Sequence, residues 1–163
     1  MANAHQHDSW TSGDAYQRFM GRWSPFLAEL FVSWLGVPPG RDWLDVGCGT
    51  GALTRTILAQ AAPARILGVD PSDAFVNFAH ENIYDPRVDF KVGSAQNLPV
   101  EDASFDVAAA GLVLNFVPDP TAALAEFKRV VRPGVKVVGR RYTMTAPNVM
   151  PNIATDTAKN AKW

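Results

Sequence analysis

The sequence feature that most constrains the fold is a glycine-rich turn that follows a short apolar segment. It reads Leu44-Asp45-Val46-Gly47-Cys48-Gly49-Thr50-Gly51, and a helical pattern begins directly after it. Glycine at the end of a strand permits a tight turn and lets a ligand touch the backbone where a Cβ would obstruct it. Ligands also bind at this end of the strands in open parallel sheets. The turn therefore predicts an α/β fold with a ligand site at Gly47, Gly49 and Gly51.

Strand-like and helix-like segments alternate along most of the chain. We expect strands over 42–47, 65–70, 88–93, 105–112 and 135–140, and helices over 24–35, 52–60, 72–82 and from 119 onward. Helical connections of this length imply right-handed crossovers and a parallel sheet covered on both faces. The predicted architecture is a Rossmann-like three-layer sandwich with a mostly parallel sheet.

Composition excludes several function classes. A chain of 163 residues with a formal charge of -1 fits one domain and offers no basic surface for holding nucleic acid. The single cysteine, Cys48, cannot form an internal disulfide or a cysteine zinc cluster, and His5 and His7 have no supporting metal ligands nearby. The sequence has neither a signal-peptide core nor an apolar run long enough to span a bilayer. We therefore expect a cytoplasmic protein with no nucleic-acid, membrane or metal partner.

An acidic residue at the end of the second strand supports a nucleoside site. Asp70 closes the segment Leu67-Gly68-Val69-Asp70, nineteen positions after Gly51. A carboxylate in this place can accept both ribose hydroxyls of an adenosine. The run from Gly47 to Ala52 also satisfies the G-x-G-x-x-A pattern of dinucleotide sites, so these features leave NAD open as the cofactor.

Two further features favour a different adenosine cofactor. Asp45 lies within the first strand, where a carboxylate suits a ligand that carries an ammonium group and is a poor neighbour for a pyrophosphate. The second feature is downstream, in the segment 93–99 and in Phe105-Asp106.

Together these motifs resemble those of class I S-adenosylmethionine-dependent methyltransferases of the small-molecule type. The segment 44–51 resembles the family's first motif, and Gly68-Val69-Asp70-Pro71-Ser72 resembles its acidic second motif. The segment 93–99 is similar to the family's adenine segment, and the likeness continues through 114–120 and 131–134. Because several motifs occur in the family's order over about residues 14–140, the resemblance is specific.

The resemblance implies a role for each of these residues. Gly47 and Gly49 would let the backbone approach the methionine end of S-adenosylmethionine, Asp45 would act near its ammonium group, and Asp70 would accept the ribose hydroxyls. Ala95 and Gln96 would bracket the adenine. Ser94 stands where the family usually has an aspartate that accepts from the adenine amino group; since a hydroxyl accepts more weakly, we expect reduced cofactor affinity.

The resemblance also points to three further residues around the cofactor and the acceptor. Asn115 follows the fourth strand, where many relatives have histidine, and we predict that it orients the methyl acceptor. Tyr16 and Arg22 lie in a segment that resembles the family's N-terminal lid, where Tyr16 would cover the cofactor and Arg22 would meet its carboxylate.

The likeness ends shortly after Gly134. We expect a flexible lead-in over 1–13, a cofactor-binding domain over 14–143 and a polar divergent tail over 144–163. The C-terminal strands of the usual methyltransferase fold are then expected to be missing, which would leave the fifth strand at an exposed edge and favour self-association.

The expected function is methyl transfer from S-adenosylmethionine to a small-molecule acceptor that the sequence does not identify. The first alternative is a truncated, non-catalytic relative with weak or no cofactor binding. A second alternative, from another enzyme class, is an NAD-dependent oxidoreductase.

Overall fold

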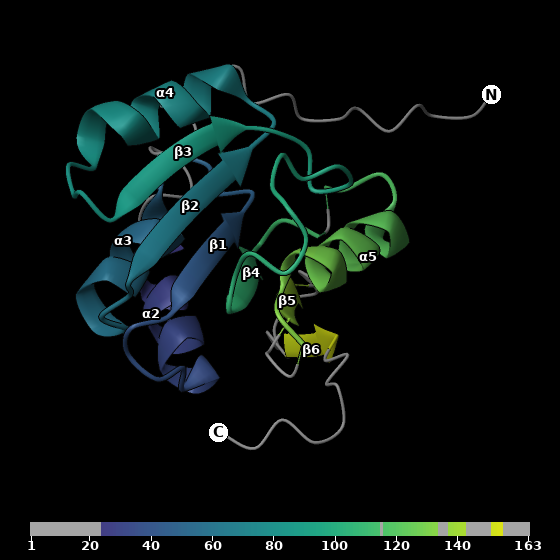
Figure 1. Ribbon diagram of the computed structural model, residues 1–163, viewed down its shortest axis with the longest axis horizontal. Helices are drawn as coiled ribbons and strands as arrows, with labels where there is room; N and C mark the ends of the chain where they lie inside the picture. The colour runs from purple at the N-terminus through teal and green to yellow at the C-terminus, as the bar shows by residue number, and fades with distance from the viewer. Residues whose placement is uncertain (1–23, 115, 134–136, 143–150, 155–163) are drawn as a thin grey trace, which may run out of the picture.

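The computed structural model describes residues 24–114, 116–133, 137–142 and 151–154, which form one α/β unit around a single sheet (Figure 1). The strands in chain order are β1 Asp42–Val46, β2 Arg65–Asp70, β3 Val88–Val92, β4 Val107–Gly111, β5 Val137–Tyr142 and β6 Pro151–Ala154. The helices are α2 Ser24–Leu35, α3 Ala52–Gln60, α4 Asp73–Asn82 and α5 Pro120–Val130.

The sheet order is β3-β2-β1-β4-β5-β6, with β1 to β5 parallel and β6 antiparallel to β5. The order reverses between β1 and β4, so the carboxyl ends of these two strands flank the crevice where open α/β sheets bind ligands. The predicted mostly parallel, Rossmann-like sandwich is confirmed.

Alternate residues of the central strands feed two separate cores. On one face, Trp43 and Ile66 pack with Phe31 of α2 and Ile57 of α3, while α4 packs nearby against β2 and β3. On the other face, the buried side of α5 packs on strand residues that point the opposite way; this core includes Leu44, Val46, Leu67, Val69, Ala108, Ala110, Ala123, Phe127 and Val130. Figure 1 shows α5 set apart from α2, α3 and α4.

The helix starts follow ordinary capping rules. Asp119 caps α5, with Pro120 in the first turn, and its carboxylate accepts from the backbone N–H groups of Thr121 and Ala122. Ser72 caps α4 through a hydroxyl that accepts from Phe75 N–H. At the other end of a helix, Gly36 takes a φ of 56° directly after α2.

The C-terminal region differs from the sequence-based expectation. The sequence predicts that β5 lies at an open edge of the sheet, followed by a polar tail over 144–163. Instead β6, within this tail, pairs with β5 from Gly139↔Ala154 to Tyr142↔Pro151. A short polar segment lacks the alternation that identifies a strand, but it gains strand hydrogen bonds by lying against an existing edge.

Candidate functional site

The glycine turn between β1 and α3 presents backbone to an open space. Gly47 N–H and Cys48 N–H both donate to the carbonyl oxygen of Val69, at 2.6 and 3.1 Å, which ties the turn to the end of β2. Gly49 has a φ of 53°, and a Cβ built on it would have no heavy atom within 4 Å. Gly49 therefore combines a conformation that favours glycine with an approach that is free for a ligand.

Asp70 joins this turn to the end of β2. One carboxylate oxygen accepts from Gly49 N–H and the other from Ser72 N–H, both at 2.9 Å. Its burial raises the pKa of this carboxyl, and the two hydrogen bonds partly offset the rise. Each oxygen has a second lone pair, so Asp70 can accept ligand hydroxyls while it holds the turn.

A cleft of about 520 Å³ opens over the carboxyl ends of β1, β2 and β4. Its volume lies in the range of cofactor pockets, roughly 300–1,000 Å³. The cleft is lined by Gly47, Gly49, Asp70, Pro71, Ser72, Phe75, Ser94, Ala95, Gln96, Gly111, Leu112, Val113, Phe116, Val117 and Pro118. The structure thus brings together the candidate residues Gly47, Gly49, Asp70, Ser94, Ala95 and Gln96.

Two candidate residues lie outside this lining. Gly51 precedes α3 with a φ of 86°, and the side chain of Ile83 packs so closely that a Cβ would overlap it. Glycine at this position therefore serves the geometry of the turn and the packing against Ile83. Asp45 lies within β1 at 1% exposure, and its Oδ2 accepts from the Thr54 hydroxyl of α3 at 2.7 Å.

Asp45 is electrostatically unusual. Burial raises the pKa of its carboxyl to about 7, and the nearby charge of Asp70 adds to the rise, while the Thr54 hydrogen bond opposes it. Among the described residues, its Oδ1 has no hydrogen-bond partner. A buried carboxylate with an unused oxygen next to the glycine turn can attract a cationic group, either directly or through water.

The segment after β3 forms the far wall of the cleft. The Ser94 hydroxyl accepts from Gln96 N–H at 3.2 Å, and Ser94 and Asn97 form an isolated antiparallel bridge. Ala95 is buried at this turn, whereas Ser94 is exposed. The Ser94 oxygen is therefore both near the cleft and already engaged by one local donor.

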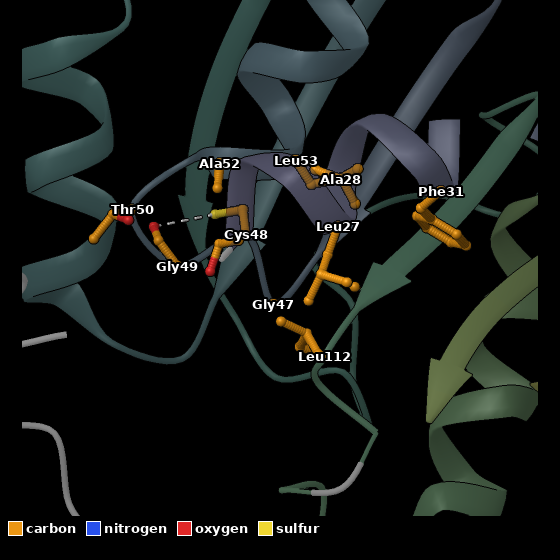
Figure 2. Close-up of a pocket in the computed structure, with 12 residues that line it drawn as sticks. Leu27, Ala28, Phe31, Gly47, Cys48, Gly49, Thr50, Ala52, Leu53 and Leu112 are labelled. Atoms are coloured by element: carbon orange, nitrogen blue, oxygen red, sulfur yellow. Dashed lines mark hydrogen bonds between the residues drawn. The ribbon is translucent and has the colours of Figure 1, made fainter. Parts of the chain in front are cut away.

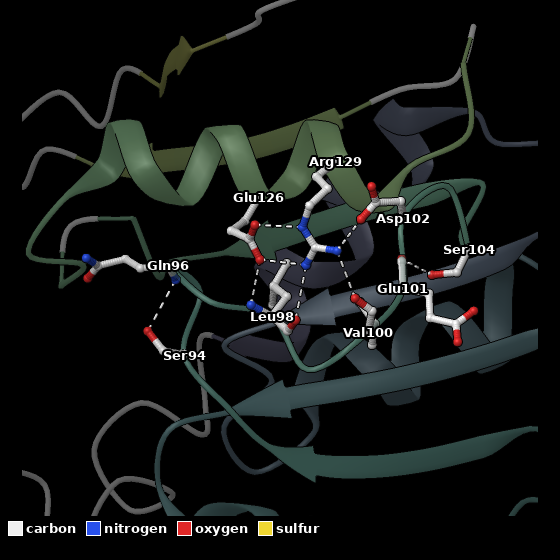
Figure 3. A network of polar contacts seen from close by, with 9 residues as sticks. All are labelled: Ser94, Gln96, Leu98, Val100, Glu101, Asp102, Ser104, Glu126 and Arg129. Atoms are coloured by element: carbon white, nitrogen blue, oxygen red, sulfur yellow. Dashed lines mark hydrogen bonds and ion pairs between the residues drawn. The ribbon is translucent and has the colours of Figure 1, made fainter.

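Sequence reasoning missed two side chains of α5 that hold this segment. Glu126 accepts from Leu98 N–H at 2.7 Å, and Arg129 donates to the carbonyl oxygens of Leu98 and Val100 at 3.1 and 2.9 Å (Figure 3). Their spacing on one helix was visible in the sequence, but a contact between a helix and a loop about 30 residues away depends on the fold.

The near wall of the cleft is apolar and follows β4. Leu112 takes a φ of 64°, and Phe116 N–H donates to the Val113 carbonyl at 2.8 Å, which turns the chain toward α5. The Phe116 side chain is 75% exposed. This wall offers apolar surface for a bound molecule.

A smaller cavity of about 50 Å³ lies between α2 and the glycine turn (Figure 2). Leu27, Phe31 and Leu112 point toward it, and it shares Gly47 and Gly49 with the cleft. Its volume suits a few atoms at most.

Cys48 lies beside this cavity and is buried. Burial raises the pKa of its thiol well above the ordinary value, so the thiol stays protonated near neutrality. A protonated, buried thiol is a poor nucleophile.

Three candidate residues, Asn115, Tyr16 and Arg22, lie outside the described residues, as does the lead-in over 1–13. Within the described ranges, no cluster of three or more His, Cys, Asp or Glu side chains is arranged to hold a metal ion. None of the helices described by the structure has the length and apolarity needed to cross a membrane.

Comparison with protein families gives one match, to a model described as a methyltransferase domain, over residues 44–139. The matched range runs from the first residue of the glycine motif to β5, and so contains every described residue proposed for the site.

Individual relatives agree with this match. Demethylmenaquinone methyltransferase of Symbiobacterium thermophilum is 33% identical over 132 residues, which cover 77% of this chain and 52% of the enzyme. The chain spans between about a third and about half of the length of the first curated relatives that it matches.

Solved structures show the same fold. The structure of a Haloferax volcanii Trm112 methyltransferase activator in complex with a methyltransferase matches with a TM-score of 0.75 at 24% identity, over 85% of this chain and 61% of that one. The [4+2]-cyclase SpnF matches with a TM-score of 0.66 at 31% identity, over 72% of this chain and 44% of that one.

Proposed function

This chain belongs to the class I S-adenosylmethionine-dependent methyltransferase family, and from that premise we propose that it binds S-adenosylmethionine in the cleft and transfers the methyl group to a small molecule. The observation that carries the proposal is the joining of Gly49 to Asp70 at the mouth of the cleft. This contact brings open backbone next to a carboxylate that could accept ribose hydroxyls, which suits an adenosine with a charged tail.

The described residues suit this cofactor along its length. The open space at Gly49 would take the tail next to the backbone, and Asp70 would accept the ribose hydroxyls. Ala95 and Gln96 would flank the adenine, with a weaker acceptor in Ser94 than an aspartate would supply. Asp45 would attract the ammonium group of the cofactor through its Oδ1, which has no hydrogen-bond partner among the described residues.

The chemistry asks the protein mainly for positioning. S-adenosylmethionine supplies a methyl group that its sulfonium sulfur already activates toward in-line displacement. The chain then has to hold the acceptor in line and keep water out, which needs no nucleophilic side chain. We propose that Asn115 orients the acceptor, that Tyr16 covers the cofactor and that Arg22 meets its carboxylate.

The near wall of the cleft favours an acceptor with an apolar face. Its residues between β4 and α5 present no charged side chain among those described; they are Leu112, Val113, Phe116, Val117 and Pro118. The demethylmenaquinone methyltransferases among the relatives are named for a small-molecule substrate. We therefore propose a small, largely apolar acceptor rather than a nucleic acid.

A second candidate is a relative that binds the cofactor without transferring its methyl group. One observation favours it: a structural neighbour with 31% identity is titled a cyclase. An NAD-dependent oxidoreductase is the third candidate; the buried charge of Asp45 argues against a pyrophosphate beside the turn.

Calorimetric titration with S-adenosylmethionine, S-adenosylhomocysteine and NAD separates these candidates. We expect the first two to bind and NAD not to bind. Asp70→Ala should weaken binding at least about tenfold, since it removes a charged acceptor of ribose hydroxyls. Asp89→Asn, which alters a carboxylate of β3 outside the cleft, is the control and should bind like the wild type.

Binding of NAD alone would contradict the choice of cofactor, and equal affinity of Asp70→Ala and wild type would remove the ribose assignment. If the cofactor binds, release of S-adenosylhomocysteine in the presence of a panel of apolar acceptors supports methyl transfer. Binding without release across such a panel supports the non-catalytic candidate.

A further inference from the structure

We propose that Glu126 and Arg129 are positioning residues for the adenine end of the cofactor, an inference that rests on the function proposed above. Both lie on α5 and neither lines the cleft. They act on the cleft through the backbone of the segment that follows β3.

The contacts are made to main-chain groups of that segment. The Leu98 N–H donates to Glu126 Oε2 at 2.7 Å, and the Leu98 carbonyl accepts from Arg129 Nη2 at 3.1 Å. The Val100 carbonyl accepts from Arg129 Nη1 at 2.9 Å. The Leu98 carbonyl also accepts from Val100 N–H at 2.8 Å. The two side chains add hydrogen bonds of the kind that a strand would receive from its neighbour.

The two side chains also fix each other. Arg129 Nε and Nη2 lie 2.7 Å from the two carboxylate oxygens of Glu126, a bidentate pair (Figure 3). Arg129 also meets Asp102, whose side chain is 78% exposed. A planar guanidinium held on two sides has one orientation, so the carbonyl groups that it binds are held in one place as well.

The residues between Ala95 and Leu98 connect this arrangement to the cleft. Gln96, which lines the cleft, is two residues before Leu98, and Ala95 packs in the same core as Leu98 and Phe127 of α5. A shift of the Leu98 backbone would therefore move Ala95 and Gln96, the residues that we propose flank the adenine. Those groups can distinguish adenine from a base with reversed donors and acceptors, but only while they are held in register.

The test compares S-adenosylhomocysteine with its inosine analogue, in which the 6-amino group is replaced by oxygen. Binding of both is measured by calorimetry for the wild type, Arg129→Gln and Arg129→Lys, at a temperature where circular dichroism shows each to be folded. The matched control is Arg87→Gln, which breaks another bidentate ion pair, with Asp85, outside the cleft.

We expect Arg129→Gln to bind S-adenosylhomocysteine about tenfold more weakly and to lose most of its preference over the inosine analogue. Arg129→Lys keeps the positive charge but not the planar guanidinium. Its affinity and its preference should lie between those of Arg129→Gln and the wild type, and it replaces Arg129→Gln in the comparison if that variant does not fold. Hydrogen exchange at the amides of 95–98 should quicken in both, whereas Arg87→Gln should alter neither the preference nor that exchange.

An unchanged preference, with both ligands weakened equally or not at all, would overturn the inference while leaving the proposed function standing. Failure of the wild type to bind either ligand would contradict the proposed function itself, and this inference with it.

Discussion

At the scale of single residues, the site combines a buried carboxylate in each of two neighbouring strands. Asp45 and Asp70 both have raised pKa values because burial disfavours their charged forms, and the charge of Asp70 raises the pKa of Asp45 further. Asp70 is compensated by two backbone N–H donors, whereas Asp45 has one hydroxyl donor. Two acidic groups thus lie at the end of the sheet where a cationic cofactor would lie, and a bound cation would favour their charged forms.

Asp45 should make stability depend on pH. Its folded pKa of about 7 exceeds the ordinary value of 3.8, so the folded state keeps a proton that the unfolded state releases. Stability contributed by this proton is complete below about pH 4 and is lost as the pH rises through 7. Urea midpoints should therefore fall from pH 5 to pH 8 in the wild type, and fall less in Asp45→Asn.

The control for this measurement is Asp89→Asn, which should follow the wild type at both values of pH. Parallel pH profiles for Asp45→Asn and the wild type would show that Asp45 does not hold the proton.

Ser94 should limit cofactor affinity. Replacement by aspartate restores a charged acceptor, and charge-assisted hydrogen bonds are about twice as strong as neutral ones. Ser94→Asp should bind S-adenosylhomocysteine about fivefold more tightly, by calorimetry. Ser94→Asn adds a side chain of similar size without the charge and should not reproduce the gain; equal or weaker binding by Ser94→Asp would contradict the account.

At this scale the sequence predicted part of the site. The glycine turn, Asp70 and the segment 94–96 were predicted, since each occurs in a local pattern, and the structure brings them to one cleft. The burial of Asp45 against Thr54 was not foreseen, and neither was the hold of Arg129 on Leu98. Both depend on which helix packs over which strand, and local patterns carry no such information.

At the scale of elements, α5 supports both walls of the cleft without lining it. Its N-terminus follows Pro118 of the near wall, and its last turns hold the far wall through Arg129. Since Asp119 caps the helix through two backbone N–H groups, the cap stabilises the element on which both walls depend.

Loss of this cap should therefore lower the free energy of unfolding by a measurable amount. Asp119→Ala should lower the free energy of unfolding by about 1 kcal/mol, because two donors at the helix start lose their acceptor. Asp119→Ser keeps a capping oxygen and should recover most of the loss in urea unfolding. Equal destabilisation by Ala and Ser would mean that the cap hydrogen bonds are not the cause.

Element positions were largely predictable, and the discrepancies have local causes. The first strand ends at Val46 rather than at Gly47, because Gly47 takes a φ of 70°. The fourth strand is shorter than its apolar run: Phe105 forms only an isolated bridge with Val131, and Leu112 has a positive φ. An apolar run in the sequence marks residues that are buried, and residues beyond the last strand hydrogen bonds can be buried too. The run is therefore longer than the strand.

At the scale of the whole molecule, the edge strand of the sheet beyond β5 is β6. The sequence predicted an open edge at β5, but β6 pairs with β5, so the expected route to self-association through the β5 edge is not present in the described strands. The polar composition of the tail gave no indication of this pairing, which depends on an available edge.

Removal of residues 143–163 should therefore uncover β5. We expect the truncated chain to self-associate at concentrations where the full chain does not, because an unpaired edge strand can pair with another chain. Size-exclusion chromatography with light scattering measures this directly. A truncated chain with the same mass distribution as the full chain would show that β6 does not protect the edge.

The central claim is that the cleft at the carboxyl ends of β1, β2 and β4 holds S-adenosylmethionine. The most direct measurement is a crystal structure of the chain with S-adenosylhomocysteine. We expect the ribose hydroxyls within hydrogen-bond distance of the Asp70 carboxylate, the amino-acid tail against Gly49 and the adenine between the near wall and Ala95–Gln96. A ligand bound elsewhere, or in this cleft with its ribose away from Asp70, would contradict it.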